Sequence, residues 1–177
     1  MSAGVDLDRP FRTMRRLVAL RAAAVPTLPA DASLAEAARL LGRRGVTAAA
    51  VTRGDALAGV VSHRSIAAAA ARLPEATPQS LTTGACTEAV PVVGLDTAVP
   101  EALAQLASGA ADHIGSEHAA PAPAAPDHVA VVDPEGRVVD LLSRADLLAE
   151  LVWHQGEVIR EMRLQERLMH LQGVYSC

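Results

Sequence analysis

Two stretches of the chain share one pattern of apolar and polar positions. Residues 31–37, with the sequence DASLAEA, recur at residues 96–102 as DTAVPEA. Each copy continues with apolar residues at the i, i+3, i+4, i+7 spacing of a helix face. These residues are Leu34, Ala37, Ala38 and Leu41 in the first copy, and Val99, Ala102, Leu103 and Leu106 in the second. A strand-like segment precedes each helix, at residues 24–28 and 89–93, and an Asp/Ser/Thr cluster suits the start of each.

The duplication continues downstream of these helices. Residues 46–52 and 57–62 flank the turn sequence RGDA, and residues 128–132 and 137–143 flank the turn sequence DPEG. Apolar runs on either side of a glycine-containing turn are typical of β-hairpins. Each hairpin leads into a predicted helix, which begins near Ser65 in the first copy and at Arg144 in the second. The repeated unit is therefore strand, helix, strand, strand, helix.

The second copy is longer than the first. A Pro- and Ala-rich insertion near residues 109–127 accounts for the difference, and its composition is typical of a loop or linker. We predict an α+β fold of two tandem β-α-β-β-α motifs related by quasi-two-fold symmetry. The first motif is expected at residues 25–80 and the second at residues 81–151. A helical arm at residues 1–24 is expected to precede them.

The C-terminal segment is predicted to be one long helix. From Arg144 to about residue 171 the chain has no proline and one glycine, so this helix should continue for about 25 residues, leaving residues 152–177 as an extension and tail. One face carries Leu148, Leu151, Val152, Val158, Ile159, Met162 and Met169, and the heptad is interrupted at Gln155 and Glu166. We expect another surface to pack on an apolar face of this kind and remove it from water. The candidates are dimerisation, a protein partner, or the N-terminal residues Phe11, Met14, Leu17 and Val18.

The composition excludes several kinds of site. Of the 177 residues 50% are hydrophobic and 2% aromatic, and there are 37 alanines, no lysine and no asparagine. Without lysine the chain has no P-loop, pyridoxal Schiff base or lysine general base. A net charge of −4 and the scarcity of aromatic rings argue against nucleic-acid binding. We expect a small, aliphatic core, with arginine and backbone N–H groups as the donors for any anion.

The two cysteines and the apolar runs bear on location. Cys86 and Cys177 are too few for a disulfide framework, which favours a reducing compartment. No apolar stretch approaches the roughly 20 residues of a membrane-spanning helix. Asp6, Asp8 and Arg21 argue against a signal peptide. We therefore expect a cytoplasmic protein that does not associate with membranes.

Catalytic and metal-binding patterns are weak. His113, His118 and His128 gather around the insertion, but their spacing and the loop that carries them are poor for a metal site. Neither a Gly-x-Ser-x-Gly sequence nor a cysteine with a positioned histidine and acid occurs. We expect a protein that is not an enzyme and requires no cofactor.

The repeated unit resembles a cystathionine-β-synthase (CBS) domain, and the pair resembles a Bateman module, over about residues 25–151. In this family the hairpin ends in Gly, two apolar residues, Ser or Thr, two variable residues and Asp. The second copy reads DLLSRAD at residues 140–146, and the first reads GVVSHRS at residues 59–65. The second copy departs from the pattern at Asp140, where glycine is usual. The first departs at Ser65, which replaces the acid.

Each strand-to-helix junction in this pattern is a candidate ligand site. Backbone N–H groups and the positive end of the helix dipole favour an anion or a hydroxyl-rich group there. Ser143 can donate or accept a hydrogen bond, Arg144 offers a charged fork to phosphate, and Asp146 can accept from a ribose diol. Ser-x-x-Asp is equally the pattern of a capping box, so that alternative stays open. In the first copy Ser62 and Ser65 lack the acid.

The resemblance implies a ligand and a function. It assigns the ribose and phosphate of an adenosyl ligand to Ser143 and Asp146, and the base to an apolar slot. The candidates for this slot are Val90, Val92, Val129 and Ala130. The implied function is a non-enzymatic regulatory module that senses AMP, ADP, ATP or S-adenosylmethionine in the cleft between the motifs.

The alternative function is a structural or dimerisation module with a vestigial ligand site that acts through its C-terminal helix. Paired modules of this family commonly associate through their helices. We therefore expect a homodimer in which the C-terminal helices take part. The same helix is the candidate surface for a protein partner.

Overall fold

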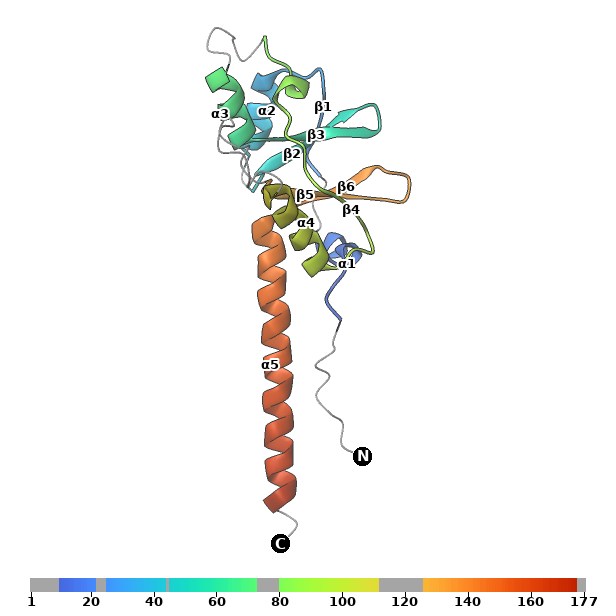
Figure 1. Ribbon diagram of the computed structural model, residues 1–177, viewed down its shortest axis with the longest axis vertical. Coiled ribbons are helices and arrows are strands. Elements are labelled where there is room, and N and C mark those ends of the chain that lie inside the picture. Colours follow the sequence, from blue (N-terminus) through green and yellow to red (C-terminus); the bar gives the residue numbers. More distant parts are fainter. Residues whose placement is uncertain (1–9, 22–24, 44, 73–79, 112–125, 175–177) are drawn as a thin grey trace.

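The computed structural model confirms an α+β fold with two copies of one motif (Figure 1). It describes residues 10–21, 25–43, 45–72, 80–111 and 126–174. The first motif comprises β1 (Thr27–Pro29), α2 (Leu34–Leu41), β2 (Ala48–Arg53), β3 (Ala56–Ser62) and α3 (His63–Arg72). The second comprises β4 (Val92–Gly94), α4 (Val99–Ala111), β5 (His128–Val132), β6 (Val138–Ser143) and α5 (Arg144–Val174). Helix α1 (Met14–Leu20) precedes both motifs, and the short 3₁₀ helix η1 (Thr83–Cys86) lies between them in sequence.

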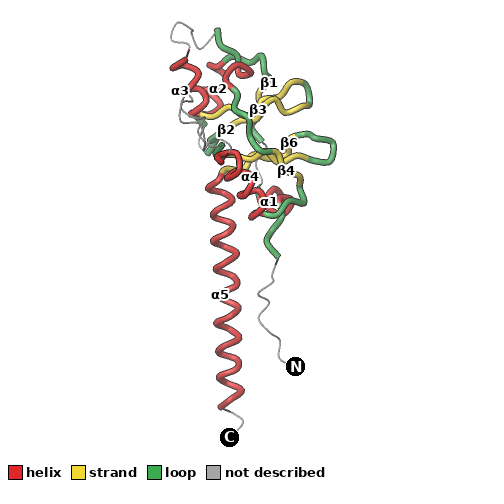
Figure 2. The backbone as a smooth tube through the Cα atoms, in the orientation of Figure 1, coloured by secondary structure: helices red, strands yellow, loops and turns green. Residues whose placement is uncertain are grey.

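The two sheets repeat one topology. Their strand orders are β1-β2-β3 and β4-β5-β6, and in each sheet the first pair of strands is parallel and the second antiparallel. The pairing register shifts at the same place in both hairpins, between Val51 and Thr52 and between Val131 and Val132. The sheets lie side by side, with α2 and α3 on the first motif and α1 and α4 on the second (Figure 2). The expected quasi-two-fold relation is thus present down to single residues.

Three groups of buried side chains form the core. One lies inside the first motif around Val51 and Val61, and one inside the second around Leu106 and Leu142. The third lies between the two sheets and consists of Ala48, Ala50, Val60, Ala130 and Leu141. Because three of these five are alanines, the two sheets can approach closely without large side chains. This packing explains how a chain with 2% aromatic residues forms a core.

The two motifs exchange short segments. The N–H of Val99, in the second motif, donates to the carbonyl of Arg12 at 3.2 Å, so the residues just before α1 complete that motif. The equivalent contact in the first motif comes from the residues before η1, where the N–H of Leu34 donates to the carbonyl of Leu81 at 2.9 Å. Each motif is therefore completed by the segment that precedes the other one in sequence.

The exchanged segments also supply core side chains. Met14 and Leu17 of α1 are buried in the second motif, and Cys86 of η1 is buried in the first. Glu88 forms a β-bridge with Val60 of the first motif. Residues 81–88, which the sequence analysis groups with the second motif, therefore contact the first motif.

Gly59 shows what the close approach of this segment requires. A Cβ at Gly59 would lie 2.8 Å from the Cβ of Thr87 and 2.9 Å from the carbonyl oxygen of Glu88. Asp140 occupies the equivalent place opposite Val131 in the second motif, as Gly59 does opposite Val51 in the first. The glycine of the family pattern is thus explained in the first motif by backbone packing.

Several element bounds differ from the predicted ones. Helix α3 begins at His63 rather than near Ser65, because Ser62 and Ser65 cap it, and the first strand of each motif begins three residues later than predicted. Helix α5 has 31 residues rather than about 25 and projects far beyond both sheets (Figure 1). The described residues do not include most of the insertion. They also do not include His113, His118 or Cys177.

Candidate functional site

The junction between β6 and α5 is a capping box. The N–H and hydroxyl of Ser143 donate to Oδ2 of Asp146 at 2.8 and 2.6 Å, and the N–H of Asp146 donates to the hydroxyl oxygen of Ser143 at 3.1 Å. Burial acts to raise the pKa of Asp146, but the hydrogen bonds from Ser143 and the ion pair with Arg21 hold it below its usual value. The capping alternative is therefore realised, and a ligand at this junction has to compete with it.

Arg21 also lies at this junction, although the sequence analysis does not name it as a candidate site residue. It follows the last residue of α1, and its Nη1 lies 3.1 Å from Oδ2 of Asp146. Its Nε lies 3.3 Å from Oδ2 of Asp140, a buried carboxylate whose Oδ1 accepts from the Leu141 N–H at 2.8 Å. Burial raises the pKa of Asp140, and Arg21 counteracts that effect. One guanidinium therefore pairs with two carboxylates, at the first and last positions of the DLLSRAD sequence.

The junction between β3 and α3 is built in the same way with two serines. The N–H of Ser62 donates to the hydroxyl oxygen of Ser65 at 2.9 Å, and the N–H of Ser65 donates back to that of Ser62 at 3.2 Å. Both residues are buried. The hydroxyl of Ser62 also donates to Oε1 of Glu88 at 2.7 Å. An acid from the exchanged segment thus lies at the junction that lacks the acid of the pattern.

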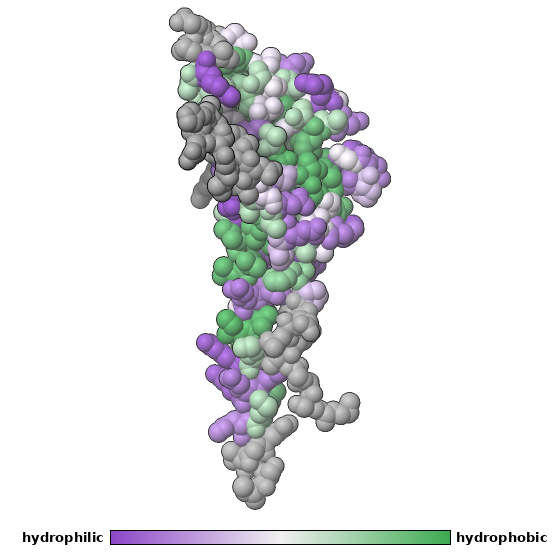
Figure 3. All heavy atoms as spheres, in the orientation of Figure 1, coloured by the Kyte–Doolittle hydropathy of each residue, from purple (hydrophilic) through white to green (hydrophobic). Residues whose placement is uncertain are grey.

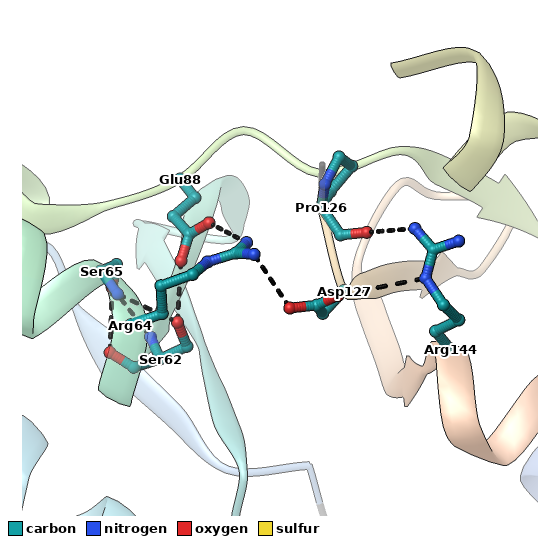
Figure 4. Close-up of polar contacts among 7 residues, drawn as sticks. All are labelled: Ser62, Arg64, Ser65, Glu88, Pro126, Asp127 and Arg144. Carbon is teal, nitrogen blue, oxygen red and sulfur yellow. Dashed lines mark hydrogen bonds and ion pairs between the residues drawn. The ribbon is translucent and has the colours of Figure 1, made fainter. Parts of the chain in front are cut away.

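Two arginines, one from each junction, converge on Asp127 (Figure 4). Nη1 of Arg64 donates to Oδ2 of Asp127 at 2.9 Å, and Nε of Arg144 lies 4.0 Å from Oδ1. Arg64 also donates to Glu88 at 2.6 Å, and this bond raises the pKa of Arg64 above its usual value. Arg144 donates to the carbonyl of Pro126 at 3.1 Å. The four charged side chains span both motifs, and Asp127 lies between two guanidinium groups, an arrangement that suits a phosphate.

The four apolar residues predicted to form the slot for the base lie in different surroundings. Ala130 belongs to the group between the sheets and Val90 packs against that group, where a base would have to enter. Val129 is fully buried in the core of the second motif, because neighbouring residues of a strand point to opposite faces. Val92 is half exposed and lies outside the three core groups. We therefore retain Val90 and Ala130 in the candidate slot and remove Val129 and Val92.

His128 links the two motifs beside this slot. Its Nε2 lies 3.2 Å from Oγ1 of Thr47, which precedes β2 of the first motif. Burial lowers the pKa of His128, although Asp127 and Glu88 act in the opposite direction. The lowered pKa favours the neutral ring near pH 7. Nε2 then donates to or accepts from the Thr47 hydroxyl, depending on the tautomer.

The described residues carry neither a cluster of metal ligands nor a membrane-spanning helix. These residues contain no group of three or more His, Cys, Asp or Glu side chains placed to hold a metal ion. No helix among them is long and apolar enough to cross a membrane.

Comparison with known proteins supports the fold. Residues 19–72 match the family model of the CBS domain. The fold, with two such motifs, is that of solved CBS domain structures.

Solved CBS structures share this fold at low sequence identity. The CBS domain protein NE2398 is 19% identical with a TM-score of 0.64, over 80% of this chain and 98% of the other. The CBS-domain containing protein ATU1752 from Agrobacterium tumefaciens is 19% identical with a TM-score of 0.59, over 77% and 96% of the two chains. CBSX2, solved in complex with AMP, is 18% identical with a TM-score of 0.57, over 81% and 98%. No curated protein matches the chain in sequence.

Proposed function

We propose that the chain is a non-enzymatic regulatory module that binds an adenosyl ligand between its two motifs. The candidate ligands are AMP, ADP, ATP and S-adenosylmethionine. The observation that carries the proposal is the convergence of Arg64 and Arg144, from the two helix N-termini, on the carboxylate of Asp127. A phosphate can take the place of this carboxylate, because its oxygens accept the same charge-assisted hydrogen bonds and carry more negative charge.

The charges favour a ligand with few phosphates. Glu88 pairs with Arg64, and a displaced Asp127 carboxylate would stay near the site, so additional phosphates would meet negative charge. The AMP bound to CBSX2 supports a monophosphate, and Val90 and Ala130 offer an apolar contact to its base. Asp146 becomes available to a ribose diol when Arg21 releases it.

Arg21 links the candidate ligand site to α5 through the residues around α1. A ligand that takes Asp146 from Arg21 loosens the C-terminal end of α1. The residues before α1 hold α5, because Arg12 donates to Glu150 at 3.2 Å and its guanidinium lies 3.5 Å from the ring centre of Trp153. Occupancy of the site thereby changes how firmly α5 is held. We further propose that the chain acts in the cytoplasm as a homodimer.

A second candidate function is a dimerisation module whose ligand site is vestigial. Two observations favour this function. Ser143 and Asp146 already hydrogen-bond to each other, and the arginines already pair with carboxylates of the chain. The output surface would again be α5.

Calorimetry with AMP, ADP, ATP and S-adenosylmethionine separates the two functions. We expect AMP to bind with a dissociation constant tighter than about 1 mM, and Arg64→Ala to weaken binding by about tenfold or more through loss of a charge-assisted bond. Arg53→Ala, at the exposed end of β2, is the matched control and should leave binding unchanged. If none of the four compounds binds and Arg64→Ala changes nothing, the dimerisation module is the correct description.

A further inference from the structure

Helix α5 carries an exposed seam that the described part of the chain does not cover. The seam repeats every three and four residues, as in a coiled coil. Its members are Leu148, Val152, Gln155, Ile159, Met162, Glu166 and Met169. Val152 is 68% exposed, Ile159 46% and Met169 62%. Figure 3 shows groups of hydrophobic side chains at the surface along this helix.

The seam lies on a different side of α5 from the contact with the two motifs. Leu147, Glu150 and His154 are buried against the remainder of the chain. At 100° per residue the seam lies roughly a third of a turn away from them. A second helix can therefore lie along the seam without meeting the domain from which α5 projects.

The two polar members of the seam select the orientation of a second copy. In a parallel pair Glu166 would face the partner's Glu166 in the seam, which places like charges together. In an antiparallel pair Gln155 faces the partner's Glu166, and an amide N–H can donate to the carboxylate. The same register pairs Val152 with the partner's Met169 and Ile159 with the partner's Met162. The six seam positions from Val152 to Met169 then match polar with polar and apolar with apolar.

The register also fits the length of α5 and the position of Gly156 within it. The layer of Ile159 and the partner's Met162 falls near the middle of α5, so the two helices pair over nearly all of their roughly 46 Å. On one flank the partner's Arg163 lies beside Gly156. A Cβ on this residue would meet nothing within 4 Å, and a surface hollow adjoins it. A glycine within a helix costs about 1 kcal/mol, and room for the partner's arginine is a use for it.

We propose that two copies of this chain associate through an antiparallel pair of α5 helices, with one CBS domain pair at each end. The inference rests on the homodimer proposed above and specifies its interface. It does not depend on ligand binding.

Sedimentation velocity of the full chain tests the surface. Ile159→Asp places a charge in the two central layers and should weaken the dimer by about 100-fold or more. Leu164→Asp is the matched control, because Leu164 is similarly exposed, at 54%, and lies outside the seam. It should leave the dimer unchanged. Circular dichroism of both variants checks that α5 remains helical.

Disulfide cross-linking tests the orientation. In a Cys177→Ser chain, Gln155→Cys and Glu166→Cys should give no covalent dimer separately and a disulfide-linked dimer when mixed and oxidised. Gln155→Cys mixed with Arg160→Cys is the control and should give none, because Arg160 lies outside the seam.

Each other outcome overturns a defined part of the inference. A chain that is monomeric at all concentrations removes the homodimer and the interface together. A dimer that Ile159→Asp does not weaken removes this interface and leaves association through another surface. A dimer in which Gln155→Cys cross-links to itself removes the antiparallel orientation. A monomer that sediments with anionic vesicles would show instead that the seam binds lipid.

Discussion

Asp146 illustrates how a single side chain can serve both the fold and a ligand site. Its carboxylate accepts from the N–H and hydroxyl of Ser143 and also pairs with Arg21. In the absence of ligand these contacts stabilise the start of α5. A bound diol would have to replace Arg21, so the affinity for ligand includes the free energy of breaking that ion pair. The capping and binding roles are therefore linked rather than exclusive.

Asp146→Asn should make the free energy of unfolding less dependent on acid pH. The pKa of Asp146 is lowered in the folded chain from 3.8, so its stabilising effect is present above about pH 4 and disappears as the pH falls through the folded value. We expect a loss of about 1 kcal/mol at pH 7, as for a weakened helix cap, and none in strong acid. Urea unfolding over this pH range measures it.

The comparison is made in an Asp140→Asn background and has a control. Asp140 titrates with the opposite sign, because its pKa is raised on folding, and the charge of Asp146 contributes to that rise, so its titration would not cancel between the two proteins. Asp96→Asn removes an exposed carboxylate that pairs with Arg15 and should change stability by less than about 0.5 kcal/mol. Equal losses at pH 7 and in strong acid would contradict a role for the Asp146 charge.

Among the elements, α1 connects parts of the chain that lie far apart in sequence. Its buried Met14 and Leu17 belong to the second motif, and Arg21 at its end reaches the candidate site. On its N-terminal side the ring of Phe11 packs on His154 with centroids 4.1 Å apart. A helix of seven residues thus joins the candidate site to α5.

Arg12→Ala should release the first turns of α5 from the arm. Glu150 would keep a buried carboxylate without its cation, and we expect a loss of about 2 kcal/mol in the free energy of unfolding. Trp153 is the single tryptophan of the chain, so its emission reports the loss of the overlying guanidinium directly. Acrylamide, a neutral quencher, should then quench it more efficiently.

Arg16→Ala serves as the control for this release, because Arg16 is an exposed residue of α1. Its tryptophan emission and quenching should match those of the unaltered chain. Unchanged quenching in Arg12→Ala would show that the arm does not hold α5.

At the scale of the whole molecule, the contact between the sheets decides whether the two motifs act together. Ala50 and Ala130 are fully buried there, and no large side chain separates the sheets at these positions. The candidate ligand site lies across the same contact, between α3 and α5. A change in the spacing of the sheets therefore reaches both Arg64 and Arg144.

Ala130→Leu should push the two sheets apart. Overpacking of a buried alanine site costs about 1–3 kcal/mol, measurable by thermal or urea unfolding. The variant should also bind AMP more weakly, because Arg64 and Arg144 move apart. Ala107→Leu, on the exposed side of α4, should leave both quantities unchanged. An Ala130→Leu chain of full stability would contradict the close contact between the sheets.

Local patterns predicted the elements well, and contacts distant in sequence were the ones that escaped prediction. The helices and hairpins follow from periodicity within each copy. The position of Arg21 depends on the arm crossing to the second motif, for which no local pattern exists. Val129 and Ala130 could have been separated in advance, because adjacent strand residues face opposite sides. Asp127 was identifiable only as an acid near the junction, since its two arginines come from different motifs.

The exchanged segments have a consequence for how the chain can be divided. A single repeat, taken with its own helices and hairpin, lacks the strip of backbone that closes it, because that strip precedes the other repeat in sequence. Cutting the gene between the repeats would thus separate each half from its own closing strip. Either half would need such a segment from another molecule, so the folding unit is the pair rather than the single repeat.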